Sequence, residues 1–248
     1  MKKLLILSIL LLAFVTFKID SVNAKSMLDI NSKIIKSLET DLTGDGKTEN
    51  IILSGVSLND SPLYENIKIT VSDNKTGVTL FSIIPTTNVG YEPSIMLGDF
   101  TGDGLYELFY ASSSGDGVGY YYLYTFNEDY SILYDYERDI TSFTASYEDW
   151  YKLKVYNKDN AYLVDLSTKE KEISSIYNNG IVTDTINAKI KCVSNAYPCY
   201  DYLSKTYNLL VVRNIVTNSS GVTLCKLVES YNYTNKEKVL TESNVIIV

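Results

Sequence analysis

The chain has 248 residues and carries 22 lysines and arginines against 30 aspartates and glutamates, which gives a net charge of −8. This acidic balance argues against nucleic acid and anionic membranes as partners. The absence of histidine from the sequence excludes Ser-His-Asp and Cys-His active sites and zinc bound through histidine. An enzyme built on this sequence would have to use carboxylates, lysine, tyrosine or a bound metal.

The N-terminus predicts export from the cell. Two lysines are followed by an apolar stretch from Leu4 to Phe17, and residues 21–24 (SVNA) end in a V-x-A cleavage pattern. This is the pattern of a secretory signal peptide, and it is too short for a comfortable membrane span. We therefore expect a signal peptide over residues 1–24 and one β-repeat domain over residues 25–248. The mature protein, with a net charge of −10, would be secreted or associated with the cell envelope, without stable membrane insertion.

A nine-residue pattern, D-x-T-G-D-G-x-x-E, occurs at residues 41–49 (the first loop) and 99–107 (the second loop), with starts 58 positions apart. It places oxygen-bearing side chains at positions 1, 3, 5 and 9 and glycines at positions 4 and 6. Calcium takes six to eight oxygen ligands, and glycines permit the tight turn around it. We expect one calcium ion in each loop, serving to hold the loop rather than to perform chemistry. The expected ligands are Asp41, Thr43, Asp45, Lys47 (main-chain carbonyl) and Glu49, and Asp99, Thr101, Asp103, Leu105 (main-chain carbonyl) and Glu107.

Two alternatives compete with this interpretation. Ordinary β-turns also use Asp and Gly, although two copies of one pattern favour calcium. An EF-hand would need a bidentate carboxylate at position 12, where this chain has Ile52 or Tyr110. Each loop leads instead into a short apolar run, 51–53 or 108–110, which is typical of a buried strand.

The strings TDLTGDGKTENIIL and GDFTGDGLYELFY resemble FG-GAP/VCBS-type repeats, the calcium-loop repeats of integrin-like β-propellers. The block at residues 88–126 resembles secreted VCBS-repeat proteins of Gram-positive bacteria. The resemblance covers residues 38–126 and implies blade-like β-units of about 50–60 residues, but no particular activity. A degenerate repeat is expected near residues 190–248. Its ligand positions would be occupied by Tyr200, Tyr202, Ser204 and Asn208, so we expect no calcium there.

The remaining elements are predicted as strands and turns. Residues 67–84 and 152–165 each form a hairpin pattern, and residues 120–126 form a strand with alternating tyrosines. The string Ser167-Thr168-Lys169-Glu170 is a capping box that predicts a short helix to about Tyr177. We therefore expect an all-β fold, either propeller-like or an irregular assembly of blades, with at most one short helix.

Three cysteines, Cys192, Cys199 and Cys225, lie in the C-terminal third. In an exported protein the first two could form a disulfide across a loop at Pro198. The alternative, which we favour, is three small buried apolar residues.

Two aromatic clusters, residues 120–124 and 147–151, suit a sugar or peptide ligand, and we name Tyr121 and Trp150 as candidate contacts for an envelope glycan or protein. The alternative is that both clusters belong to the strand core. We expect an exported, calcium-binding β-repeat protein with a structural or ligand-binding role, and no enzyme. The second hypothesis is a secreted hydrolase that acts on cell-wall material or polysaccharide through carboxylates or a bound metal.

Overall fold

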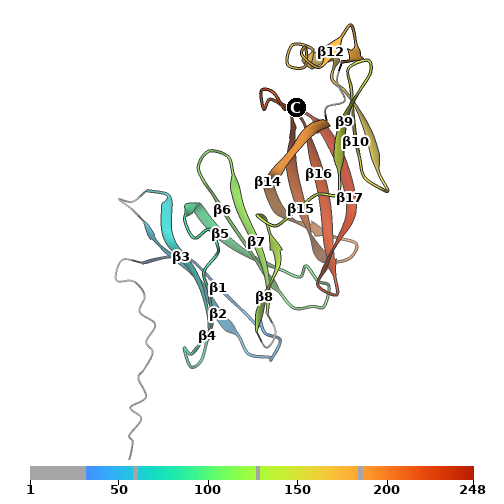
Figure 1. Cartoon of the computed structure of the whole chain (residues 1–248). Coiled ribbons are helices and arrows are strands. Elements are labelled where there is room, and N and C mark those ends of the chain that lie inside the picture. Colours follow the sequence, from blue (N-terminus) through green and yellow to red (C-terminus); the bar gives the residue numbers. More distant parts are fainter. Residues whose placement is uncertain (1–31, 58–60, 127–128, 184–186) are drawn as a thin grey trace, which may run out of the picture. The chain divides into compact units, whose positions relative to one another are not determined.

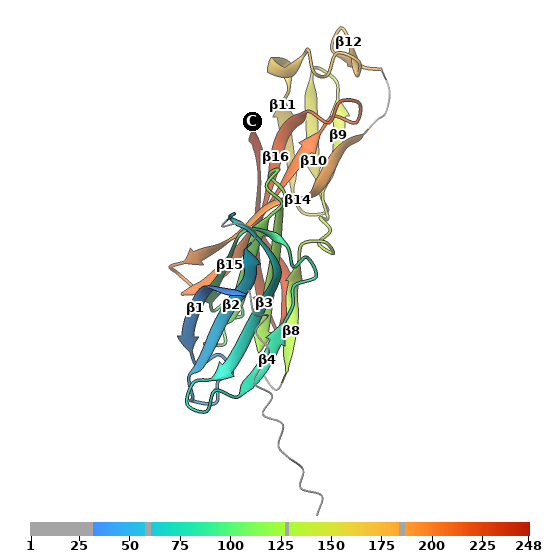
Figure 2. The same ribbon diagram turned by 90° about the vertical axis from the view of Figure 1, so that its left-hand side faces the viewer.

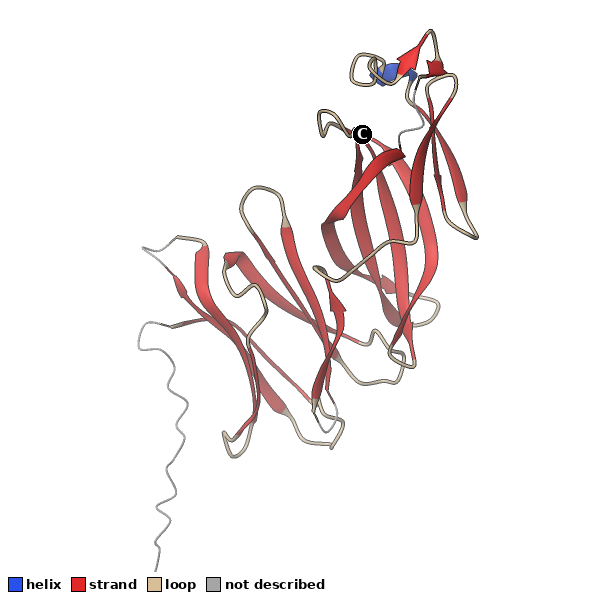
Figure 3. Cartoon of the chain, viewed as in Figure 1, coloured by secondary structure: helices blue, strands red, loops and turns tan. Residues whose placement is uncertain are grey.

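A computed structural model of the chain describes residues 32–57, 61–126, 129–183 and 187–248 (Figure 1). The expected signal peptide, residues 1–24, lies outside the described residues. Strands dominate the described part, whose helical content is one short 3-10 turn (Figure 3), so the all-β expectation is confirmed. No helix in the described ranges is long and apolar enough to cross a membrane.

The first sheet has eight strands in the order β1-β2-β3-β5-β6-β7-β8, with β4 paired to β3, and all its pairs are antiparallel. Figure 2 shows β1, β2 and β3 side by side. The strands are β1 (Lys33–Thr40), β2 (Glu49–Ser57), β3 (Leu63–Asp73), β4 (Thr79–Ile83), β5 (Gly90–Gly98), β6 (Glu107–Ser113), β7 (Gly119–Phe126) and β8 (Tyr130–Asp135).

The second sheet has seven strands in the order β11-β10-β9-β14-β15-β16-β17. They are β9 (Thr144–Glu148), β10 (Lys152–Tyr156), β11 (Ala161–Asp165), β14 (Asn187–Asp201), β15 (Thr206–Val216), β16 (Thr223–Thr234) and β17 (Glu237–Ile247). A separate pair, β12 (Tyr177–Asn178) and β13 (Ile181–Val182), follows the 3-10 turn η1 (Ser167–Lys169). The hairpins expected over residues 67–84 and 152–165 are confirmed as β3–β4 and β10–β11.

The chain repeats a four-stranded antiparallel meander three times. The first unit is β1–β4, the second unit is β5–β8, and the third unit is β14–β17. The first and second loops each connect the first two strands of their unit, and the two units share one sheet through the pairing of β3 with β5. In the third unit the short turn at residues 202–205 (the third turn) takes the place of the loop. The degenerate repeat therefore keeps its strands and loses the nine-residue loop.

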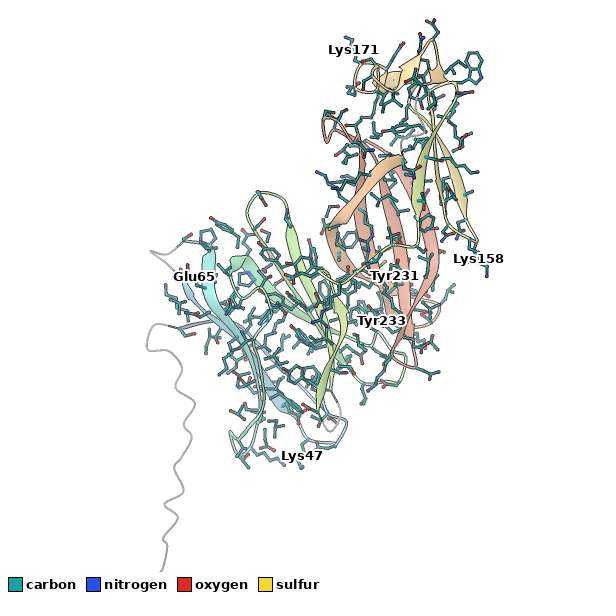
Figure 4. All side chains as sticks on the ribbon, viewed as in Figure 1. Lys47, Glu65, Lys158, Lys171, Tyr231 and Tyr233 are labelled. Atoms are coloured by element: carbon teal, nitrogen blue, oxygen red, sulfur yellow. The ribbon has the colours of Figure 1, made fainter. Side chains whose placement is uncertain are left out.

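Strands β6 and β7 of the second unit are buried on both faces because they pack between the other two units. Leu108 and Tyr110 of β6 point into a cluster with Ile51 and Ile69 of the first unit. Phe109, one position along, points the opposite way into a cluster with residues of the third unit. Since successive strand residues face opposite sides, this arrangement explains the continuous apolar run after the second loop. The third-unit side of that cluster includes Tyr231 and Tyr233 (Figure 4).

A buried ionic cluster lies beside this contact. Arg213 of β15 is almost fully buried, and its Nε donates to Glu229 Oε2 at 2.8 Å. Its Nη2 pairs with Asp139, which also pairs with Lys238. Tyr231 donates its hydroxyl to Glu229 Oε1 at 2.7 Å. These contacts compensate the charges that burial removes from water.

Two local predictions are corrected by the structure. The helix expected from Ser167 to Tyr177 is reduced to the 3-10 turn Ser167–Lys169, with Leu166 in the N-cap position and no side-chain cap. The amide of Ser167 is instead bound by Asp165 Oδ1 at 2.9 Å, so the predicted cap residue lies inside the turn. Burial of Ile173 among the core side chains holds the following turns in place.

The cysteines also differ from the prediction. Cys225 is buried, as expected, but Cys192 and Cys199 are exposed, and all three are free thiols. Cys192 and Cys199 lie seven positions apart on one continuous strand, β14, rather than across a loop. A strand rises about 3.3 Å per residue, which puts these two thiols far beyond disulfide distance.

Candidate functional site

The two loops share one hydrogen-bonding pattern. In the first loop, Asp41 Oδ1 accepts the amide of Gly44 at 2.8 Å and Oδ2 accepts that of Gly46 at 2.9 Å. In the second loop, Asp99 accepts the amides at the same two positions, at 2.6 and 3.0 Å. The four glycines have φ between 75° and 84°, a region that glycine adopts without strain. The first aspartate of each pattern therefore organises its loop.

The ninth-position glutamates accept main-chain amides at the start of each loop. Glu49 Oε2 accepts the amides of Leu42 and Thr43 at 2.8 and 3.2 Å, and Glu107 Oε2 makes the same pair of bonds at 2.8 and 3.3 Å. Both glutamates are almost fully buried. Thr101 and Thr125 each donate a hydroxyl to Glu107 Oε1 at 3.2 Å. Burial raises the pKa of Glu107, while the amide of Phe100 acts in the opposite direction.

The carboxylates of the first loop lie close enough together to hold one metal ion. One oxygen each from Asp41, Asp45 and Glu49 lies within 4.8 Å of the others. Ligands at 2.3–2.6 Å from a common ion lie at most about 5 Å apart, so this separation is compatible with one bound cation. Across the described ranges, no other group of three such side chains meets this limit. The expected carbonyl ligands at Lys47 and Leu105 remain predictions.

An ion pair occupies part of the first loop. Lys47 Nζ lies 2.7 Å from Asp45 Oδ2, and both side chains are about half exposed. This contact lowers the pKa of Asp45. Exposed pairs of this kind contribute little to stability, so a cation can replace the lysine at low cost. Lys47 lies at the tip of the first loop (Figure 4).

The loops contact one another in sequence. Leu105, at position 7 of the second loop, lies so close to Gly44 that a Cβ there would be 2.9 Å from Leu105 Cδ2. Thr206 aligns with Leu105 in the third repeat. Its Cγ2 lies 3.5 Å from the position that a Cβ on Gly102 would occupy. The amide of Tyr207 also donates to the carbonyl of Asp99 at 2.7 Å. Position 7 of each repeat therefore covers the position-4 glycine of the repeat before it.

A groove of about 640 Å³ lies beside this row of loops. Tyr106 and Tyr207, which hold the same position in the second and third repeats, both line it, together with Tyr200. Its remaining lining residues come from the first and second units and the third turn: Glu39, Thr40, Leu97, Asp99, Gly104 and Lys205. The groove is not predicted from the sequence, although the repeat pattern places Tyr106 and Tyr207 at equivalent positions.

The two predicted ligand contacts are in different environments. The expectation that Tyr121 presents its ring to a ligand is corrected, because this residue is only 8% exposed. Its ring stacks on Phe109, with 6.2 Å between ring centroids, and its hydroxyl donates to Asn195 at 2.7 Å. Trp150 is 69% exposed in the turn between β9 and β10, where its amide donates to Gly180. The two residues belong to different sheets and do not form one site.

Comparison with known proteins gives a family relationship. The family described as "YybI C-terminal domain" matches residues 141–246, a region that begins just before β9 and ends within β17. A Bacillus subtilis (strain 168) protein named "Uncharacterized protein YybI" is 30% identical over 191 residues, which are 73% of this chain and 72% of that protein. No solved structure matches. The chain therefore belongs to the YybI family.

Proposed function

We propose that the protein is an exported, calcium-binding β-repeat protein in which calcium stabilises the row of loops beside a ligand-binding surface. The observation that carries this proposal is the repeated arrangement of Asp41 with Glu49 and Asp99 with Glu107, each pair fixed by the same main-chain bonds. The convergence of Asp41, Asp45 and Glu49 adds direct support for a cation. The threonine at position 3 makes each loop less negative than one with aspartate there, so we expect a dissociation constant of about 10⁻⁴–10⁻³ M.

Calorimetry with calcium tests the proposal. The wild-type protein should bind two ions, and Asp45→Asn and Asp103→Asn should each remove or weaken one of them. Asp159→Asn is a matched control, because it removes the same charge from the turn between β10 and β11, outside both loops. An absence of binding at millimolar calcium would refute the proposal. Loss of binding in the Asp159 variant would show that general charge, rather than loop geometry, attracts the ion.

Export and the type of activity need separate tests. We propose that residues 1–24 direct secretion, so the mature protein should be recovered from the medium or cell envelope with an N-terminus near Lys25. We also propose a binding or structural role without catalysis. The competing hydrolase hypothesis predicts that the purified protein releases soluble fragments from cell-wall material or polysaccharide. Such release, abolished by substitution of a loop carboxylate, would replace the binding proposal with the enzymatic one.

A further inference from the structure

We propose that the groove between the second loop and the third turn binds a neutral oligosaccharide, with Tyr106 and Tyr200 as its stacking residues. The proposal names a ligand class and a site for the binding role proposed above, and it rests on that role. It replaces both contacts predicted from the sequence, because the ring of Tyr121 is buried and Trp150 lies in the β9–β10 turn, outside the groove lining.

The groove presents aromatic rings to solvent. Tyr106 is 45% exposed and Tyr200 is 38% exposed. Tyr200 also contacts Tyr207 and Tyr202, with ring centroids 5.0 Å apart in both pairs, so its ring is supported on two sides. An aromatic face with a hydroxyl at its edge suits a ligand that is apolar on one side and hydrated on the other. A sugar ring, with a C–H face and a rim of hydroxyls, has this character.

Tyr207 fixes the floor of the groove. A Cβ at Gly98 would lie 2.6 Å from Tyr207 Cδ2, so only glycine allows this ring to approach the end of β5. Phe100 packs on the same ring, with 5.6 Å between ring centroids. Packing from the second unit therefore holds Tyr207 in place, while Tyr106 and Tyr200 remain accessible in the groove. A preformed site of this kind loses less conformational entropy on binding than a flexible one.

The charges around the groove favour a neutral ligand. Three charged residues line it, Glu39, Asp99 and Lys205. Both carboxylate oxygens of Asp99 already accept amides of the second loop. The other two side chains, Glu39 and Lys205, carry opposite charges that balance, and they offer an acceptor and a donor to ligand hydroxyls. The hydrogen bonds leave the charge of Asp99 in place, so the lining has a net charge of −1, which is too small to select a strongly charged peptide.

The size of the groove suits a small ligand. Its volume of about 640 Å³ falls within the range of about 300–1,000 Å³ for small-molecule sites. We therefore assign the groove to one or a few sugar units.

The test is titration of the mature protein with four neutral hexasaccharides: cellohexaose, maltohexaose, mannohexaose and the hexamer of N-acetylglucosamine. At least one should bind with a dissociation constant of about 1 mM or lower. Tyr106→Ala and Tyr200→Ala should each weaken that binding by about tenfold. Trp150→Ala is the matched control, because it removes an exposed aromatic residue from the β9–β10 turn, outside the groove lining, and it should leave binding unchanged. Tyr207→Ala is avoided because it would disturb the packing on Gly98.

The outcomes are distinguishable from failure of the calcium proposal. Each titration is run with calcium and with chelator, and calcium binding is measured on the same samples. Sugar binding without calcium binding would refute the calcium proposal and support the groove. The groove proposal would be overturned if the protein binds calcium but none of the hexasaccharides. It would also be overturned if Trp150→Ala abolishes sugar binding while both tyrosine variants retain it. Binding of peptides but no sugar at Tyr106 and Tyr200 would overturn the assigned ligand class.

Discussion

The side chain of Leu105 lies against the main chain of Gly44, and this contact joins the second loop to the first. The equivalent contact of Thr206 with Gly102 joins the second loop to the third repeat. Because the loops touch in a row, a change in one affects the packing of the next. The position-4 glycine therefore has two roles: it adopts a positive φ, and it leaves room for its neighbour.

We expect Gly44→Ala to destabilise the protein more than Gly46→Ala. Both glycines have positive φ, near 76° and 80°, so each alanine should cost about 1–2 kcal/mol of unfolding free energy. A side chain at Gly46 meets nothing within 4 Å, whereas one at Gly44 meets Leu105. Urea unfolding of Gly44→Ala, Leu105→Ala and the double variant should give a coupling energy of at least about 0.5 kcal/mol. Equal losses at Gly44 and Gly46 would contradict the contact.

Calcium removal should lower the melting temperature. A ligand present at ten times its dissociation constant stabilises the native state by about 1.4 kcal/mol per site. For a domain of this size, that corresponds to about 3–6 °C per site. Scanning calorimetry with calcium, with chelator and with magnesium should show the largest effect for calcium, because magnesium requires a stricter octahedral geometry. A melting curve that chelator does not move would contradict the stabilising role.

Removal of Arg213 should be severe. Arg213→Met would leave Glu229 buried without its cation and Asp139 paired with Lys238 alone, and breaking a buried pair typically costs about 3–5 kcal/mol. Lys152→Met is the control, because it breaks an exposed pair with Asp165 and should have a much smaller effect. Denaturant midpoints compare the two variants. Similar midpoints would mean that the buried cluster contributes no more than a surface pair.

The protein should lose stability at high pH through its buried tyrosines. Burial raises the pKa of Tyr110 to about 12 and that of Tyr147 to about 12. A group whose pKa is higher in the folded state stabilises that state fully below its unfolded pKa, near 10, and loses this contribution as the pH rises through the folded value. Unfolding free energy should therefore fall between about pH 10 and pH 12.

Absorbance at 295 nm follows the same ionisation directly. Tyr110 and Tyr147, whose pKa values are raised by burial, should titrate together with unfolding. Tyr110→Phe should reduce the loss of stability above pH 10, since it removes one shifted hydroxyl. A single titration of all tyrosines near pH 10 in a folded protein would contradict the burial of these side chains.

The strand faces and tight turns of this protein could be predicted from the residue order alone. The alternation of Ile67, Ile69 and Val71 predicted one buried strand face, because successive strand residues point to opposite sides. The pattern of the two loops predicted their turn geometry, since Asp and Gly act on amides only a few residues away. The altered ligand positions predicted a degenerate repeat near residues 190–248, where the third unit has a short turn in place of the nine-residue loop.

The packing partner of each strand face could be identified only from the tertiary structure. The alternation in a strand shows that a side chain can be buried, but it does not name the partner, so the burial of Tyr121 against the third unit was invisible in the sequence. The exposure of Cys192 and Cys199 likewise depends on β14 being one continuous strand. The groove brings Glu39, Tyr106 and Tyr200 together although they lie far apart in the chain. Bringing such distant segments together costs conformational entropy, and the packing between the units offsets this cost. Local residue patterns do not show which units pack together, so they could not predict the site.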